Sequence, residues 1–152
     1  MRAELHQFIE GDYEFSTDPE RVDLEVVHRC LSELSYWAAG RSFELVERSW
    51  ANTALVGGAY AADGSLAGFA RMVTDLSTFG WLCDVMVVPE YRGTGVGVGV
   101  VRLLVEHPQM EGIKRQILAT ADAHELYRKF DYVDLDAPEM WMLRTRGEIS
   151  WD

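Results

Sequence analysis

A glycine-rich bend follows an apolar run near the middle of the chain, and its composition is suited to binding an anion. Residues 84–99 read DVMVVPEYRGTGVGVG, and the next residues, VVRLLVEH, favour a helix. A glycine inside a helix costs roughly 1 kcal/mol relative to alanine, so this run needs a structural or chemical reason. A helix that begins directly after a strand offers free N–H groups and the positive end of its dipole, and glycines without Cβ atoms let a pyrophosphate lie against them. Arg92 adds a positive charge at the same place.

Three other interpretations of the glycines were weighed. They could make only a tight turn and a close contact between helix and sheet. A P-loop would need a Lys-Ser/Thr pair after its glycines, whereas Val98 and Gly99 follow Gly97. A dinucleotide-binding GxGxxG is not met either, because the glycines run GxGxGxG. A nucleotide-binding protein is therefore the least favoured class.

Two motifs together resemble the GNAT superfamily of N-acetyltransferases. The stretch VPEYRGTGVG, residues 88–97, resembles that family's acetyl-CoA motif, Arg/Gln-x-x-Gly-x-Gly/Ala, with its core at Arg92, Gly95 and Gly97. The stretch AHELYRKFDY, residues 123–132, resembles the family's Ala-x-x-Leu-Tyr-x-x-x-Gly-Phe helix. One expected helix and one expected strand separate the two motifs, as in the family.

The resemblance implies acetyl-CoA as cosubstrate, held by backbone amides after the preceding strand and by the bend. Thr120 stands where the family commonly has Asn, and Gly99 where a larger residue is usual. Asp131 replaces the usual Gly at a helix end, and Asp tolerates the left-handed conformation that such a turn needs. The residues implied for cofactor binding are Met86, Val87, Val88, Arg92, Gly93, Thr94, Gly95, Val96, Gly97 and Thr120.

The resemblance also implies that an amine attacks the thioester directly in a ternary complex. Freeing the lone pair of an amine with a pKa of about 10.4 costs on the order of 4 to 5 kcal/mol at pH 7. Asp84, which interrupts an apolar strand, or a chain of waters could accept that proton; alternatively, Asp84 is a hydrogen-bonded structural residue at a bulge or loop. Tyr127 occupies the family position that protonates the departing thiolate, at a cost of about 2 kcal/mol for an ordinary tyrosine, unless it is a core aromatic.

The acceptor site is less constrained by motif. Tyr36 and Trp37 fall where the family has its variable acceptor wall, and rings beside acidic groups suit a cationic amine. Both rings could instead belong to the core. Asp75, at the end of an expected strand, could bind the ammonium group of a substrate or begin a turn with Ser77. The expected substrate is a small-molecule primary amine, and the alternative function is a catalytically silent sensor that binds acetyl-CoA.

These residues require a mixed α/β fold with a single domain over residues 1–152. The strand–helix–strand step from residue 79 to residue 119 implies a parallel, right-handed crossover. We expect about seven strands, mostly antiparallel with one parallel pair, flanked by about four helices. The expected strands are 13–18, 54–61, 66–74, 79–88, 117–119, 132–135 and 140–143, and the expected helices are 23–36, 43–50, one from the bend to residue 107, and 123–130.

Charge and composition limit the partners. The formal net charge is −11, with 14 Lys and Arg against 25 Asp and Glu, which disfavours nucleic acid and favours a cationic small molecule, so any bound anion needs a local basic patch. Cys30 and Cys83 show no metal-ligand spacing, so we expect reduced thiols and no metal site. Without a secretory signal or a long apolar run, a cytoplasmic protein without membrane association is expected, and exposed aromatics could support a homodimer.

Overall fold

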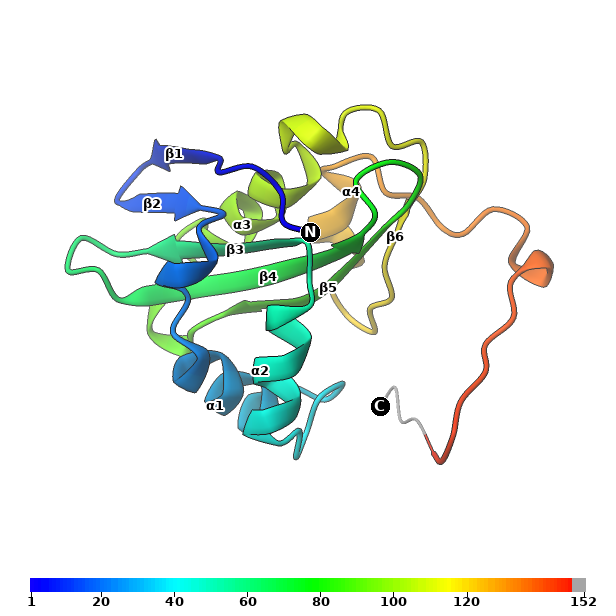
Figure 1. Ribbon diagram of the computed structural model, residues 1–152, viewed down its shortest axis with the longest axis horizontal. Coiled ribbons are helices and arrows are strands. Elements are labelled where there is room, and N and C mark those ends of the chain that lie inside the picture. Colours follow the sequence, from blue (N-terminus) through cyan, green and yellow to red (C-terminus); the bar gives the residue numbers. More distant parts are fainter. Residues whose placement is uncertain (149–152) are drawn as a thin grey trace.

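The computed structural model describes residues 1–148 and contains one six-stranded sheet whose strands lie in sequence order (Figure 1). Each strand up to β5 pairs antiparallel with the next, whereas β5 and β6 are parallel. The mixed α/β fold with one parallel pair is therefore confirmed. The strands are β1 (Gln7–Glu10), β2 (Tyr13–Ser16), β3 (Leu55–Tyr60), β4 (Leu66–Thr74), β5 (Gly80–Val87) and β6 (Gln116–Ile117).

Four α-helices flank the sheet, and the first two begin at side-chain caps. Asp23 accepts hydrogen bonds from the amides of Glu25 and Val26 at the start of the first helix, and Ser42 accepts one from Leu45 at the start of the second. The helices are α1 (Leu24–Leu34), α2 (Phe43–Ala51), α3 (Val96–Val105) and α4 (His124–Arg128).

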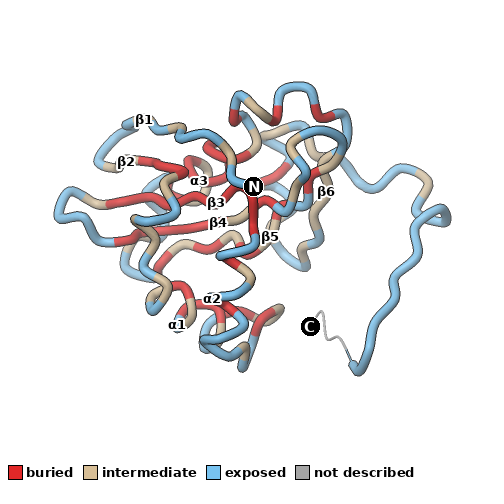
Figure 2. Tube along the Cα trace, viewed as in Figure 1, coloured by how far each residue is buried: buried red, intermediate tan, exposed pale blue. Residues whose placement is uncertain are grey.

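Two apolar clusters hold the helices against the two faces of the sheet. One cluster joins α1 and α2 to the sheet through Val27, Trp50 and Phe69, and the other joins α3 to the opposite face through Phe15 and Val100. Figure 2 shows the buried residues concentrated along the central strands and the helix faces that cover them. The parallel step from β5 through α3 to β6 therefore carries the glycine bend at the start of α3.

Gly99 permits a direct contact between α3 and the N-terminal hairpin. A Cβ atom at this position would lie 2.2 Å from ring atoms of Phe15, a distance that no packed side chain tolerates. The Phe15 ring is buried and stacks on Phe8, with ring centroids 5.0 Å apart. The absence of a larger residue at Gly99 is thereby explained by close packing.

The strand count differs from the expected seven at both ends of the chain. Strand β1 was not predicted, because its alternation of polar and apolar residues is short and mostly exposed. The expected strands 132–135 and 140–143 do not form within the described residues; the segment from residue 133 to 148 is mostly exposed and extends away from the sheet (Figures 1 and 2). Asp134, Asp136 and Pro138 interrupt its apolar residues, and neither stretch pairs with β6.

Candidate active site

The bend before α3 presents free backbone amides to solvent. Gly93 and Gly95 have φ values of +75° and +89°, a left-handed conformation that favours glycine, and a Cβ atom at either would meet nothing within 4 Å. Residues 92–95 are exposed, and α3 has no side-chain cap. The amides of residues 93–98 donate to no acceptor in the part of the chain that the structure describes. This arrangement fits a pyrophosphate, because the donors are unsatisfied and at the positive end of the helix dipole.

A cavity opens where β5 and β6 separate. The two strands pair at Gly80 with Gln116 and at Trp81 with Ile117, and beyond Trp81 the edge of β5 faces no strand from residues 1–148 on that side. The cavity has a volume of about 900 Å³ and reaches from Gly97, in the first turn of α3, to Tyr127 on α4, whereas residues 92–95 of the bend do not line it. Met86, Val87 and Thr120 line it as the resemblance implies, whereas Val88 and Val96 are buried in the two core clusters. An extended cofactor can therefore lie along the edge of β5 beyond Trp81.

Tyr127 lies in the wall of this cavity with its hydroxyl unpaired. The residue is 8% exposed, and its hydroxyl makes no hydrogen bond to a group within residues 1–148. Burial raises the pKa of Tyr127 to about 12, and Tyr36 and Asp122 contribute in the same direction. The hydroxyl is thus protonated at neutral pH and available as a donor.

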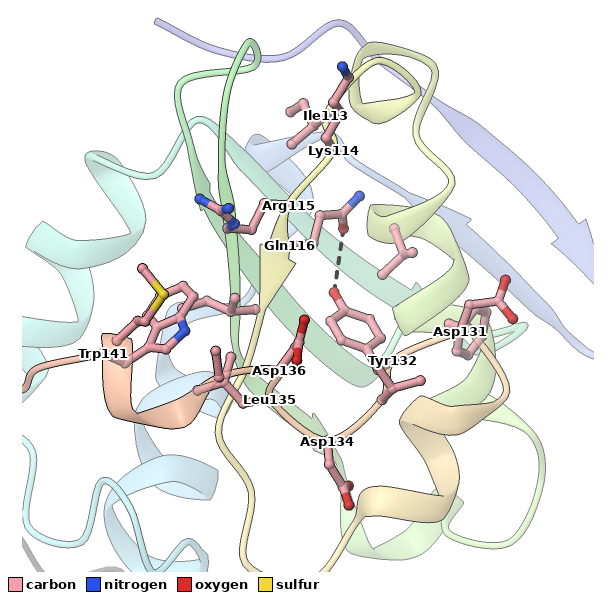
Figure 3. Close-up of a pocket in the computed structure, with 16 residues that line it drawn as sticks. Ile113, Lys114, Arg115, Gln116, Asp131, Tyr132, Asp134, Leu135, Asp136 and Trp141 are labelled. Carbon is pink, nitrogen blue, oxygen red and sulfur yellow. Dashed lines mark hydrogen bonds between the residues drawn. The ribbon is translucent and has the colours of Figure 1, made fainter.

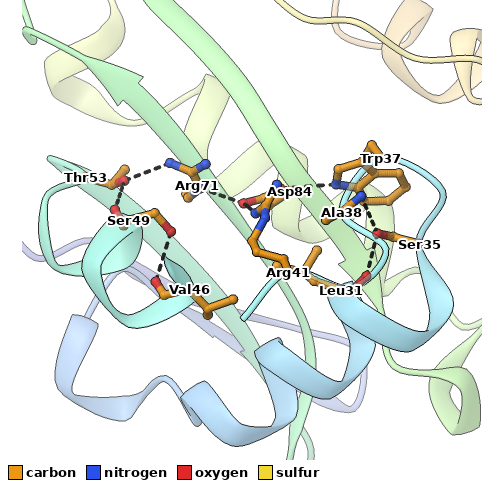
Figure 4. A network of polar contacts seen from close by, with 10 residues as sticks. All are labelled: Leu31, Ser35, Trp37, Ala38, Arg41, Val46, Ser49, Thr53, Arg71 and Asp84. Carbon is orange, nitrogen blue, oxygen red and sulfur yellow. Dashed lines mark hydrogen bonds and ion pairs between the residues drawn. The ribbon is translucent and has the colours of Figure 1, made fainter. Parts of the chain in front are cut away.

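Asp84 lies at a β-bulge and is bound by three donors (Figure 4). Its φ is +52°, and the register between β4 and β5 shifts at this point. Its carboxylate accepts hydrogen bonds from Arg71 Nε at 2.7 Å, Arg41 Nη1 at 2.9 Å and Trp37 Nε1 at 3.1 Å. Burial raises the pKa of the Asp84 carboxyl, but Arg71 and Arg41 outweigh it and hold the pKa below its usual value. The structure therefore favours the alternative in which Asp84 is a structural residue at a bulge.

The expected acceptor residues are only partly brought together. Tyr36 and Trp37 line the cavity, with their rings edge to face and their centroids 4.9 Å apart. Asp75 lies outside the cavity and begins a turn, because its carboxylate accepts from the amides of Ser77, Thr78 and Phe79. These bonds all go to Oδ1, and the Thr78 hydroxyl donates to Oδ2. Together they lower the pKa of Asp75. Asp75 is therefore not brought together with Tyr36 and Trp37.

Two threonines of the expected cofactor set have internal partners. Thr94 Oγ1 donates to the carbonyl of Tyr91 and lies 2.9 Å from the hydroxyl of Tyr13. Thr120 Oγ1 accepts from the amide of Ala123 at 3.1 Å, just before α4. Both side chains thus fix the main chain around the cavity, and the amide of Thr94 stays free.

The helix end at Asp131 has the conformation expected for the family's glycine. Asp131 has a φ of +65°, and the amide of Tyr132 donates to the carbonyl of Tyr127 across the turn. The prediction that Asp can replace Gly here is confirmed.

The family model described as "Acetyltransferase (GNAT) family" matches residues 13–132, which include both the bend and Tyr127. The chain belongs to the GNAT acetyltransferase family. A relative from Gibberella zeae, named "Putative acetyltransferase", is 29% identical over 137 residues, which cover 78% of this chain and 77% of that protein. The predicted family is confirmed.

Solved structures of other proteins share the fold. A crystal structure from Xanthomonas campestris pv. campestris, described as "a putative acetyltransferase belonging to the gnat family", has a TM-score of 0.85 and 33% identity, covering 91% of this chain and 96% of its own. A Clostridium acetobutylicum "predicted acetyltransferase with acetyl-CoA" has a TM-score of 0.65 at 16% identity, covering 88% and 94%. The second likeness concerns the fold alone.

Three cavity residues of this GNAT chain were not predicted. Arg41 and Arg71 were missed, although an arginine that interrupts the apolar run LAGFARMVT mirrors the isolated Asp84 and could have indicated a buried pair. Cys83 also lines the cavity, and burial raises the pKa of its thiol to about 11.

Within residues 1–148 no group of three or more His, Cys, Asp or Glu side chains could hold a metal ion. None of the helices in that range is long and apolar enough to cross a membrane.

Proposed function

We propose that this GNAT protein transfers an acetyl group from acetyl-CoA to the primary amine of a small molecule, by direct attack in a ternary complex. The observation that carries the proposal is the cavity that reaches from Gly97, in the first turn of α3, to Tyr127, with the free amides of the bend directly before that turn. A bend used only for packing would have its amides covered by the protein's own groups, and here they are exposed.

Acetyl-CoA would be held mainly by main-chain atoms. The amides of residues 93–98 and the Arg92 guanidinium suit its pyrophosphate, and the free edge of β5 at Met86 and Val87 suits its amide-bearing arm. When bound, acetyl-CoA supplies an activated acetyl thioester. Gly97 leaves room at the junction, because a Cβ atom there would just touch Val87 at 3.4 Å.

Tyr127 would donate a hydrogen bond to the departing sulfur. With a pKa of about 12, it would lose about 5 kcal/mol on full proton transfer to a thiolate whose conjugate acid has a pKa near 8.5. This cost exceeds that of an ordinary tyrosine. The hydroxyl therefore acts by stabilising the developing charge through a hydrogen bond and keeps its proton during bond cleavage.

Water, and not Asp84, would take the proton of the amine. A general base is most efficient when its pKa is near the working pH, and the pKa of Asp84 is lowered by two guanidinium groups. Transfer through an acetylated cysteine is disfavoured as well, because the Cys83 thiol has a pKa of about 11 and stays protonated. Direct attack needs neither group.

The test is a thiol-release assay over a panel of amines, paired with calorimetry of acetyl-CoA binding. We expect release of CoA above the background hydrolysis rate with at least one primary amine. If acetyl-CoA binds and release stays at background with every amine, the protein is a silent acetyl-CoA sensor. If ATP or NAD binds in preference to acetyl-CoA, the bend has been misassigned.

We further propose that two copies of the chain associate through the segment after α4. Val133, Leu135, Met140 and Met142 in this segment are exposed, Met142 by 99%. The segment borders a cavity of about 840 Å³ beside β6, into which Tyr132 and Trp141 project (Figure 3). An unpaired sheet edge next to exposed apolar residues favours pairing with a strand of a second copy.

A further inference from the structure

One wall of the cavity carries a pair of arginines whose charge exceeds that of their partner. Arg41 and Arg71 both bind the single carboxylate of Asp84, so the cluster has a net charge of +1. The Asp84 side chain is only 2% exposed, whereas those of Arg41 and Arg71 are 22% and 15% exposed. The carboxylate thus lies beneath the two guanidinium groups, and the excess positive charge faces the cavity.

Most donors of the two guanidinium groups are not used by the protein. Arg41 donates one side-chain hydrogen bond, to Asp84, and Arg71 donates to Asp84 and to Thr53 Oγ1 at 3.2 Å. Their remaining N–H groups have no acceptor among the described residues. An arginine pair of this kind is suited to a planar or tetrahedral oxyanion, which accepts two parallel hydrogen bonds.

Acidic side chains lie elsewhere in the same cavity. Asp122 is exposed and near enough to Tyr127 to raise its pKa, and Glu148 is exposed at the lining as well. The cavity therefore has an acidic side beside Tyr127 and a basic side at the arginines. A molecule with an amine at one end and an oxyanion at the other matches both sides, although the chain as a whole carries a charge of −11.

We propose that Arg41 and Arg71 bind an anionic group of the acceptor, so that the substrate is an amine that also carries a carboxylate or phosphate, such as an amino acid. The inference rests on the proposed transferase function and names its substrate class. The aromatic rings of Tyr36 and Trp37 pack against the part of the acceptor between its two charged ends.

The first experiment compares matched acceptors by thiol release. For the carboxylate, L-amino acids are compared with their methyl esters and with the corresponding decarboxylated amines. For the phosphate, phosphoethanolamine is compared with ethanolamine. We expect kcat/KM for the anionic member to exceed that of its neutral partner by at least about tenfold. The ester lowers the amine pKa and leaves more free amine, so intrinsic reactivity favours the opposite order. Equal kcat/KM for amino acids and their esters, together with equal kcat/KM for phosphoethanolamine and ethanolamine, would overturn the proposal.

The second experiment uses Arg41→Gln, which leaves Asp84 bound to Arg71 and Trp37. We expect the preference for anionic over neutral acceptors to fall about tenfold or more, with the KM for acetyl-CoA unchanged, and Arg41→Lys to restore part of it. A purely structural role for Arg41 would lower kcat/KM for both acceptors by the same factor and would contradict the proposal. Arg48→Gln is the control, because Arg48 is 63% exposed on α2 and outside the cavity.

A binding measurement separates this inference from the transferase function. N-acetylated amino acids, which need no turnover, are titrated into the CoA-loaded protein by calorimetry. Binding that weakens at least about tenfold in Arg41→Gln supports the anion site even if no amine is acetylated. Turnover of amines with no such binding difference would leave the transferase function standing and overturn the anion site.

Discussion

Tyr127 is the residue on which the proposed chemistry depends most directly. Its side chain lines the cavity, and in the proposed complex other atoms would hold acetyl-CoA. We expect Tyr127→Phe to lower kcat by about 10²-fold or more while the Kd for acetyl-CoA changes little. Steady-state kinetics and calorimetry on the same preparation check both values. A change in Kd with kcat preserved would place the tyrosine in cofactor binding.

The pH profile should show the raised pKa of Tyr127. The donor form persists below a pKa of about 12, so kcat should rise as the amine loses its proton and show no fall up to about pH 10.5. Initial rates in overlapping buffers measure this profile. A descending limb near pH 10 that disappears in Tyr127→Phe would contradict the assigned environment.

Asp84 should matter for stability more than for proton transfer. Removing one partner of a buried ion pair leaves uncompensated charge, so Asp84→Asn should lower the free energy of unfolding by about 3 kcal/mol near neutral pH. Because the folded pKa is lowered, the wild-type advantage is full above the unfolded value of about 3.9 and shrinks as pH falls through the folded value. Urea unfolding at several pH values tests this.

Asp12→Asn is the matched control for Asp84→Asn, since Asp12 is exposed in the turn between β1 and β2. Activity of Asp84→Asn should follow the folded fraction. Loss of an acidic limb from the kcat profile, with the fold intact, would instead restore Asp84 as the base.

The two motifs predicted where the bend and Tyr127 lie, and charge pairing explains the arginines that they did not predict. A glycine pattern and an isolated tyrosine are local signals, so the bend and Tyr127 could be located from sequence. The partners of Asp84 are far from it in sequence, with Arg41 separated by 43 residues, and only the folded sheet and helices bring them together. Asp75 looked like a ligand because turn-forming and substrate-binding carboxylates are alike in sequence.

At the scale of elements, the bend before α3 is the part whose conformation and function can be separated experimentally. Gly95→Val should weaken acetyl-CoA binding at least about tenfold, because a side chain at a φ of +89° distorts the bend and covers its amides. Gly64→Val is a matched control: its φ is +86°, but it lies in the turn between β3 and β4. Calorimetry should show weaker acetyl-CoA binding only in Gly95→Val. An equal loss of affinity in Gly64→Val would mean that general destabilisation causes the effect.

Elements with strong periodicity or caps could be predicted, and elements that depend on a partner could not. The helix behind Asp23 and the apolar β5 carry their signals within their own residues. Strand β1 is stabilised by β2 and by the contact of Phe8 with Phe15, which no local pattern shows. The stretch 140–143 has the composition of a strand but pairs with no strand among residues 1–148, and composition alone does not supply one.

For the whole molecule, the exposed segment after α4 predicts self-association. Light scattering behind size-exclusion chromatography should show a concentration-dependent dimer, and Met142→Asp should shift it toward the monomer because a charge replaces a fully exposed apolar side chain. Ile9→Asp is the control, because Ile9 is 79% exposed at the far side of the sheet. A wild-type protein that stays monomeric at all concentrations would contradict the prediction.

The contact of Phe15 with Gly99 joins the N-terminal hairpin to α3, the helix that begins at the glycine bend. The ring packs directly against α3 at Gly99, and the Tyr13 hydroxyl lies 2.9 Å from Thr94 Oγ1, just before the helix. Through these two contacts, the first hairpin helps to position the amides of the bend. A larger or smaller side chain at position 15 should therefore weaken acetyl-CoA binding, although Phe15 does not line the cavity.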